Sequence, residues 1–231
     1  MEHAGNTFLV TKKEARALLA YTSRDQVRVN LQGIAVDPSS ATLAATDGHR
    51  AIFATAPGGD PWGLPASPGA PVIPADSWGA VIKAARARDF VAVQIHRAES
   101  APLGVAATLA VVPSHATAAS LDGTDPRDAG ATMIARVRLE NTAPPLANVL
   151  PRYERDDDDT PPAGLIGFNP RYLAALADLG KCLHGNTPIV WRHRGELDAA
   201  LAVARADDDA IWRVVIMPMR LESSSRGTLA A

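Results

Sequence analysis

The first 55 residues pass from a strand-like hydrophobic pattern to a helix-like pattern and back. Residues 8–10 form a short apolar run, and Thr11 stands three residues before Glu14, which is the spacing of a capping box at a helix N-terminus. The apolar stripe of the predicted helix comprises Ala15, Leu18, Leu19 and Thr22. Three further strands are predicted at residues 27–36, 42–45 and 51–55. The predicted order is strand, helix and three strands.

The same order of elements recurs twice after a Pro- and Gly-rich segment at residues 57–69. The second copy is predicted as a strand at 71–74, a helix capped by Asp76 or Ser77 with its stripe at Trp78, Val81, Ile82 and Ala85, and strands at 90–95, 105–112 and 133–139. Residues 113–130 are expected to form a loop or an extra hairpin. The third copy is predicted as a strand at 164–168, a helix with Asn169 as N-cap and Pro170 at its first position, ending at Gly180 or Gly185, and strands at 188–192, 197–204 and 211–217. Element order therefore predicts an α+β fold of three strand-helix-strand-strand-strand units.

Composition narrows the class of protein without identifying it. The chain has 231 residues, of which 47% are hydrophobic and 21% are charged, as in ordinary globular proteins. The formal net charge of −2 argues against electrostatic binding of nucleic acid by the whole surface, but it is compatible with a local basic face. A single cysteine, Cys182, allows no intramolecular disulfide, and no apolar run approaches the ~20 residues that cross a bilayer. We therefore expect a cytoplasmic protein with no signal peptide and no membrane partner.

The sequence Thr-Asp-Gly-His-Arg at residues 46–50 joins two of the predicted strands. Gly48 suits a sharp turn because glycine tolerates a positive φ, and the turn places His49 beside Arg50. A packed core rarely needs His next to Arg, so we expect the pair to be exposed or to line a pocket. A plain polar hairpin turn is the alternative.

Patterns typical of catalysis or metal binding are weak. The chain contains no HExxH motif, no Cys-rich cluster and no Gly-rich phosphate loop after a strand. Four consecutive aspartates at 156–159 lack the spacing of divalent-metal ligands and favour a solvated linker. Cys182 lies near a predicted helix C-terminus, where the helix dipole does not favour a thiolate. We expect no enzyme activity, no metal and no cofactor; a hydrolase that uses Asp47 and His49 is the least favoured alternative.

Three motifs together carry a resemblance to a known family. Residues 46–50 are followed by Phe-Asn-Pro-Arg-Tyr-Leu at 168–173 and by Val-Ile-Met-Pro-Met-Arg-Leu at 215–221, with Val-Leu-Pro at 149–151 between them. In this order and at about this spacing they resemble the bacterial DNA polymerase III beta subunit, the sliding clamp. The resemblance implies a DNA-clamp fold, with helices on one face lining a central hole and antiparallel sheets on the other face. It also implies a non-catalytic accessory subunit of a DNA polymerase.

The resemblance divides the chain into domains. Residues 1–152 resemble the middle domain of the clamp, with two repeat units and an insertion near 113–130. Residues 153–163 are an acidic, Pro-containing linker, residues 164–221 resemble the second half of the third domain, and residues 222–231 are expected to be a flexible tail. Nothing in the chain resembles the first domain or the first half of the third. Three units per chain would build a ring of twelve units from four chains.

The resemblance implies a peptide-binding cleft between the middle and third domains. Its residues would be Thr46, Gly48, His49, Arg50, Ala51, Pro144, Val149, Asn169, Tyr172, Val215, Met217, Pro218, Met219 and Arg220. Ala51 stands where the family usually has Leu, and Asn148 where Arg is common, so this pocket is smaller or less charged. The two methionines are pliable and suit a groove that accepts several peptides, with core filling as the alternative. Arg50 or Arg220 is a candidate to hold a peptide carboxylate or carbonyl.

Basic residues lie on the three predicted helices and close to their ends. They are Lys12, Lys13, Arg16, Arg24, Lys83, Arg86, Arg88, Arg171 and Lys181. If the helices line one concave face, these residues gather there and contact phosphates without reading sequence; solvated surface charge is the alternative. The expected partners are polymerases or repair proteins with a clamp-binding peptide, double-stranded DNA bound non-specifically, and further copies of the chain. The expected function is that of a processivity factor in replication or repair, and a peptide-binding adaptor or decoy that does not bind DNA stays open.

Overall fold

The computed structural model describes residues 1–59, 69–150, 166–180, 188–193, 199–206 and 208–219. The first part of the chain contains β1 (Glu2–Ala4), β2 (Thr7–Thr11), α1 (Lys12–Leu19), β3 (Gly33–Asp37), β4 (Thr42–Thr46) and β5 (Arg50–Thr55). The predicted capping box of α1 is confirmed, because Glu14 N donates to the Thr11 hydroxyl (3.2 Å) and Thr11 N donates to the Glu14 carboxylate (2.7 Å). The strand β1 was not predicted from the sequence; it pairs with β2.

The predicted strand at 27–36 is wrong in its first half. Residues Val29–Leu31 form a 3₁₀ turn (η1), and the strand β3 starts at Gly33. Val27 is 88% exposed and Val29 is 50% exposed, so the alternation that suggested a strand has no sheet to pack against. The segment instead lies beside the turn at 46–50, where Arg28 Nη1 would lie 2.8 Å from a Cβ atom added to Gly48.

The second unit follows the predicted order with two differences. Its elements are β6 (Val72–Pro74), α2 (Ala75–Ala84), β7 (Phe90–Arg97), β8 (Val105–Val112), α3 (Ala118–Leu121) and β9 (Met133–Arg138). The N-cap of α2 is Pro74 rather than the predicted Asp76 or Ser77. Asp76 lies in the first turn of the helix, where the helix dipole stabilises a carboxylate. The insertion at 113–130 contains the single-turn helix α3 and not an extra hairpin.

The third unit is incomplete among the described residues. It contains α4 (Pro170–Gly180), β10 (Val190–Arg192), β11 (Ala200–Arg205) and β12 (Ile211–Ile216), after a 3₁₀ turn η2 (Leu146–Val149). Arg171 N donates to Asn169 Oδ1 (3.0 Å), so the predicted N-cap of α4 is confirmed. In the described part of the predicted strand 164–168, the pairing is a single bridge between Gly167 and Met219. The predicted linker, the tail, Lys181, Cys182 and Arg220 lie outside the described residues.

The strands form two antiparallel sheets that exchange elements between units. The five-stranded sheet has the order β1-β2-β7-β8-β9, and the seven-stranded sheet has the order β10-β11-β12-β5-β4-β3-β6. Thus the first strand of unit one (β2) pairs with unit two, and the first strand of unit two (β6) pairs with unit one. Unit three extends the larger sheet through β12, which pairs with β5. Each repeat unit therefore forms backbone hydrogen bonds with strands of another unit.

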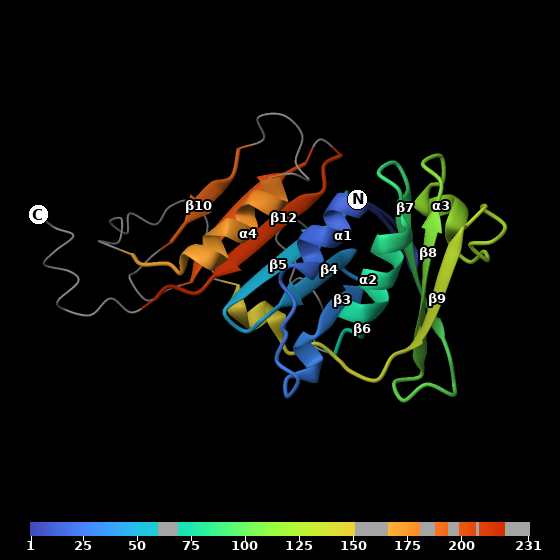
Figure 1. The fold of residues 1–231 in the computed structure, drawn as a ribbon, viewed down its shortest axis with the longest axis horizontal. Coiled ribbons are helices and arrows are strands. Elements are labelled where there is room, and N and C mark those ends of the chain that lie inside the picture. Colours follow the sequence, from blue (N-terminus) through green and yellow to red (C-terminus); the bar gives the residue numbers. More distant parts are fainter. Residues whose placement is uncertain (60–68, 151–165, 181–187, 194–198, 207, 220–231) are drawn as a thin grey trace, which may run out of the picture.

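The three longer helices lie in a row on one side of the sheets, with α1 between α2 and α4 (Figure 1). The principal hydrophobic core fills the space between the helices and both sheets, and its largest fully buried side chains include Trp78, Trp212, Tyr21 and Phe8. Burying these side chains away from water is the main source of stability for such a layered fold. Within the described residues, no helix has the length and apolar character needed to span a membrane.

Candidate functional site

The turn at residues 46–50 is held rigid by its own side chains. Asp47 Oδ1 accepts hydrogen bonds from the backbone N–H groups of His49 (2.9 Å) and Arg50 (3.1 Å). The Thr46 hydroxyl accepts a hydrogen bond from Gly48 N (3.0 Å) and donates to the Arg50 carbonyl (2.7 Å). Gly48 has a φ of +92°, which explains why glycine is needed at this position. The acid–base pair suggested by Asp47 and His49 is thus better explained as turn chemistry.

Arg50 connects the turn to two other parts of the chain. Its Nε donates to Asp47 Oδ2 (2.9 Å), and its Nη2 donates to the carbonyl of Ala20 after the end of α1 (2.8 Å). Its guanidinium also lies over the rings of Tyr21 (4.7 Å) and Tyr172 (5.5 Å). The side chain is 15% exposed. Arg50 therefore joins unit one to helix α4 of unit three, and its Nε and Nη2 already donate to partners inside the protein.

The site lies where β5 of unit one pairs with β12 of unit three. Ala51 faces Val215 in this ladder, and the pairing continues into the turn because Met217 N donates to the His49 carbonyl (2.9 Å). On the other side of the turn, the His49 ring stacks on the ring of Tyr172 at 5.9 Å, with 14° between the ring planes. The junction thus fixes the last residues of β12 against the turn.

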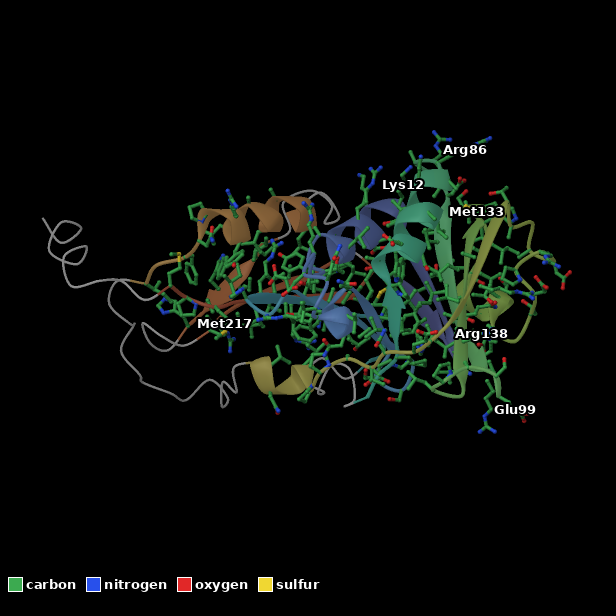
Figure 2. The ribbon with its side chains drawn as sticks, turned by 60° about the horizontal axis from the view of Figure 1, so that its bottom comes forward. Lys12, Arg86, Glu99, Met133, Arg138 and Met217 are labelled. Carbon is green, nitrogen blue, oxygen red and sulfur yellow. The ribbon has the colours of Figure 1, made fainter. Side chains whose placement is uncertain are left out.

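A cavity of about 500 Å³ opens at this junction. Its lining comprises Arg28, Asn30, Leu31, Thr46, Gly48, His49, Arg50, Ala51, Pro144, Pro145, Leu146, Asn148, Val215 and Met217. The floor is apolar and buried, since Ala51, Leu146 and Val215 belong to the second hydrophobic cluster of the protein. Met217 is 43% exposed at the edge of the cavity. Figure 2 shows Met217 on the strand side of α4, away from the outer surface of the helices.

The predicted cleft residues fall into three groups. The cavity lining includes the predicted residues Thr46, Gly48, His49, Arg50, Ala51, Pro144, Val215 and Met217. Asn169, Tyr172, Pro218 and Met219 are described outside the lining; Tyr172 contacts the turn, and Met219 N donates to the Gly167 carbonyl (2.7 Å). The side chain of Val149 and all of Arg220 lie outside the described part of the chain.

Sequence reasoning missed five residues of the lining: Arg28, Asn30, Leu31, Pro145 and Leu146. The first three were predicted to lie in a strand. The structure instead has a compact loop that starts at Asp25. The Asp25 side chain accepts a hydrogen bond from Val27 N (3.0 Å), and its carbonyl accepts one from Gln32 Nε2 (2.6 Å). An Asp two residues before an apparent strand is a turn signal that could have been used. Pro145 and Leu146 follow Pro144 directly and carry no separate signal.

The predicted basic residues lie on or beside the row of helices. Lys13, Arg16, Arg24, Lys83, Arg86, Arg88 and Arg171 are exposed. Lys12 differs because it is half-buried and its ammonium donates to the Ala85 carbonyl after the end of α2, where a cation is favoured by the helix dipole. Figure 2 shows Lys12 and Arg86 on the same outer side of the helices. No three His, Cys, Asp or Glu side chains among the described residues come together as a metal site.

Solved structures of sliding clamps match this arrangement over nearly the whole chain. The DNA polymerase sliding clamp from Bacillus subtilis has 15% sequence identity and a TM-score of 0.56, over 96% of this chain and 65% of that one. The sliding clamp from Pseudomonas aeruginosa has 16% identity and a TM-score of 0.53, over 96% and 68%. The chain has the sliding-clamp fold. The clamp from Bartonella birtlesii, solved bound to griselimycin, has 18% identity and a TM-score of 0.50, over 94% of this chain and 67% of that one.

The sliding-clamp fold is present here in shortened form. The chain spans about two thirds of the length of these three clamps, whose covered shares are 65–68%. No protein-family model matches the chain, and no curated protein matches its sequence. The predicted α+β clamp fold is thus confirmed by structure, at a sequence identity of 15–18%.

Proposed function

We propose that this chain is a sliding-clamp-like accessory factor of DNA replication or repair, without catalytic activity of its own. It binds the clamp-binding peptide of a polymerase or repair protein in the β5–β12 cavity and contacts duplex DNA non-specifically through its helices. The observation that carries the proposal is the cavity itself, because four distant segments of the chain (28–31, 46–51, 144–148 and 215–217) supply its floor and rim. A concave apolar floor with a few polar groups at the edge suits apolar peptide side chains.

The contacts of Arg50 refine the role of the turn in this proposal. Arg50 is engaged with Asp47, Ala20 and two tyrosines, so it shapes the cavity wall instead of capturing a peptide carboxylate. The exposed polar side chains of the lining are Arg28, Asn30, His49 and Asn148, which are available to a peptide backbone. Met217 adapts to the apolar side chains that enter.

Peptide binding is tested by fluorescence anisotropy with a labelled peptide that carries a polymerase clamp-binding motif. The double variant His49→Ala with Met217→Ala is expected to abolish binding, because both side chains line the cavity. The matched control is Met133→Ala, since Met133 is a half-buried methionine on β9, outside the cavity. Unchanged affinity in the double variant would remove the cavity from the proposal.

DNA contact is tested by retention on nicked circular DNA and by its salt dependence. The double variant Lys83→Glu with Arg86→Glu is expected to weaken retention and to reduce the salt slope, because both exposed cations lie at the helical face. Arg127→Glu serves as the control, since Arg127 is exposed in the insertion that packs on the opposite side of the five-stranded sheet. Peptide binding without any DNA retention would favour the adaptor that does not bind DNA.

A further inference from the structure

Each repeat unit ends in a strand of six residues: β5, β9 and β12. Two of these last strands are paired with each other, because β12 lies antiparallel to β5 from Ile211 opposite Thr55 to Ile216 opposite Arg50. The third, β9, pairs with β8 on one side and is the outer strand of its sheet. The junction that completes unit one has therefore no counterpart on unit two among the described residues.

The strands β5 and β9 differ in burial because β5 is paired on both sides and β9 on one. From Ala51 to Thr55 every residue of β5 is buried, whereas every residue of β9 is half-buried or exposed. Met133, Ala135 and Val137 pack against the principal core but are only partly covered. An outer strand with partly uncovered apolar side chains is a template for pairing with another strand.

The free edge of β9 carries unpaired backbone groups at alternate residues. Leu139 N donates to the Val105 carbonyl (3.2 Å), so Leu139 and Val105 are a hydrogen-bonded pair. In an antiparallel ladder such pairs alternate along the strand. The N–H and C=O groups of Ile134, Arg136 and Arg138 therefore point away from β8, toward solvent.

We propose that β9 pairs antiparallel with β9 of a second copy of this chain, which forms a two-fold symmetric dimer through a continuous sheet. A junction of this kind joins one last strand to another, and β9 is the last strand that lacks a mate in the described structure. Its mate is then the β9 strand of an identical chain, and a two-fold axis satisfies both edges at once. This assigns a surface to the contact with further copies of the chain that the resemblance implies, and it goes beyond the proposed function of the cavity.

The side chains of β9 select the register. A two-fold axis at Ala135 places Met133 of one copy opposite Val137 of the other on the core side of the sheet. On the outer side it places Ile134 opposite Arg136, so that no arginine faces its own copy directly. Arg136 is also partly neutralised by Asp125, whose carboxylate lies 3.6 Å from its Nη2.

The primary test is sedimentation velocity over a dilution series with wild type and Arg136→Pro. Proline removes an N–H group that points to the free edge and leaves the β8 ladder intact. Two hydrogen bonds are lost across the two-fold axis, so the dimer dissociation constant is expected to rise by about tenfold or more. Arg136→Ala, which keeps the N–H group, is the matched control and is expected to leave the dimer in place.

Cysteine cross-linking tests the register and does not depend on proline being tolerated. With Cys182 replaced by Ser, Ala135→Cys is expected to form a disulfide-linked dimer on mild oxidation. Residues at the axis form a non-hydrogen-bonded pair about 4.5 Å apart at Cα, within the range that disulfides span. Arg138→Cys is the control and is expected to remain uncross-linked, since it lies away from the axis.

Two results would overturn the proposal. One is a wild-type protein that stays monomeric at every concentration, and the other is a dimer that survives Arg136→Pro while Ala135→Cys fails to cross-link. Peptide anisotropy on Arg136→Pro separates this proposal from the function of the cavity, which lies on other strands. Unchanged peptide affinity with a lost dimer is the expected outcome. Lost peptide affinity in a folded Arg136→Pro variant would mean that the variant perturbs more than β9, and the cross-linking result then decides.

Discussion

The strands β5 and β9 hold the same place in two copies of one structural unit, yet they meet different surroundings. Each has six residues and follows a helix and two antiparallel strands. On β5, unit three adds β12 and α4, and the cavity forms at their meeting point. On β9, the described chain adds nothing beyond the strand itself. The proposed binding site is thus a property of the junction between units and not of the unit.

This difference explains why the contacts between unit one and unit three are concentrated at the turn at 46–50. The turn lies at the start of β5, so the segment that follows β12 must run past it, and Met217 N donates a hydrogen bond to the His49 carbonyl. Arg50 then reaches both α1 and Tyr172 of α4. The residue at the start of β9, Met133, is half-buried, and in the described part of the chain β9 pairs with β8 alone.

The largest expected contrast is between a core side chain on each strand. Ile52 on β5 is fully buried, and Ile52→Ala is expected to lower the free energy of unfolding by about 3 kcal/mol, through lost burial and a residual cavity. Val137 on β9 packs against the same core but is only partly covered, so Val137→Ala is expected to cost about 1 kcal/mol or less. Urea denaturation at a fixed protein concentration measures both. Equal losses would show that β9 is as well covered in solution as β5.

A second contrast concerns one arginine on each strand. Arg50→Ala removes an ion pair, a hydrogen bond to Ala20 and two ring contacts at a side chain that is 15% exposed. We expect a loss of about 2 kcal/mol in unfolding free energy. Arg136 is 62% exposed and 3.6 Å from Asp125, so Arg136→Ala is expected to cost about 0.5 kcal/mol or less. A small effect of Arg50→Ala would mean that the link between units one and three rests on the sheet alone.

How much of this was predictable from sequence differs between the same two regions. The 3.6-residue and two-residue periods predicted α1, α2 and most strands, because those elements bury one face locally. The edge strand β1 and the early start of α2 were missed, since a three-residue strand and a proline N-cap leave little pattern. The sequence motifs predicted part of the cavity lining. They did not predict Leu146 and Arg28, which line the cavity because distant segments of the chain fold together there. No local period encodes such contacts between distant segments.

A smaller effect is expected at Gly48, where the site depends on backbone conformation. Its φ is +92°, and a Cβ would lie 2.8 Å from Arg28 Nη1. Gly48→Ala is expected to lower the free energy of unfolding by about 1–2 kcal/mol, most of it backbone strain. It is also expected to displace Arg28 from the cavity rim and so to weaken peptide binding. Gly123 offers a matched control in the insertion near β9, because its φ is +72° and a Cβ there would meet nothing within 4 Å. If Gly123→Ala lowers peptide affinity as much as Gly48→Ala, the contact with Arg28 is not what matters.

The smallest expected effect is a pH dependence of stability that is confined to the five-stranded sheet. His3 lies on β1, at the opposite edge of the five-stranded sheet from β9, with its ring 4.6 Å from that of Phe8. Burial lowers the pKa of His3 below its ordinary value of 6.5, and this outweighs the opposing influence of Gly5, Asp122 and Asp37. Below pH 6.5 the unfolded chain binds the proton before the folded chain does. Stability is therefore full above that pH and falls as the pH drops from 6.5 toward the lowered pKa of the folded state.

His3→Gln is expected to remove this part of the pH dependence while leaving the stability near pH 8 almost unchanged. Hydrogen exchange of the β1 and β2 amides across the range from pH 7.5 to 5.5, corrected for intrinsic rates, should show wild-type protection falling more steeply than that of the variant. The amides of β5 and β12 serve as the internal reference, because they belong to the other sheet. Protection that falls equally in both sheets and in both proteins would mean that other groups titrate and that His3 does not loosen its edge. A loss confined to β1 and β2 would show that one edge of the five-stranded sheet opens without disturbing the junction that forms the cavity.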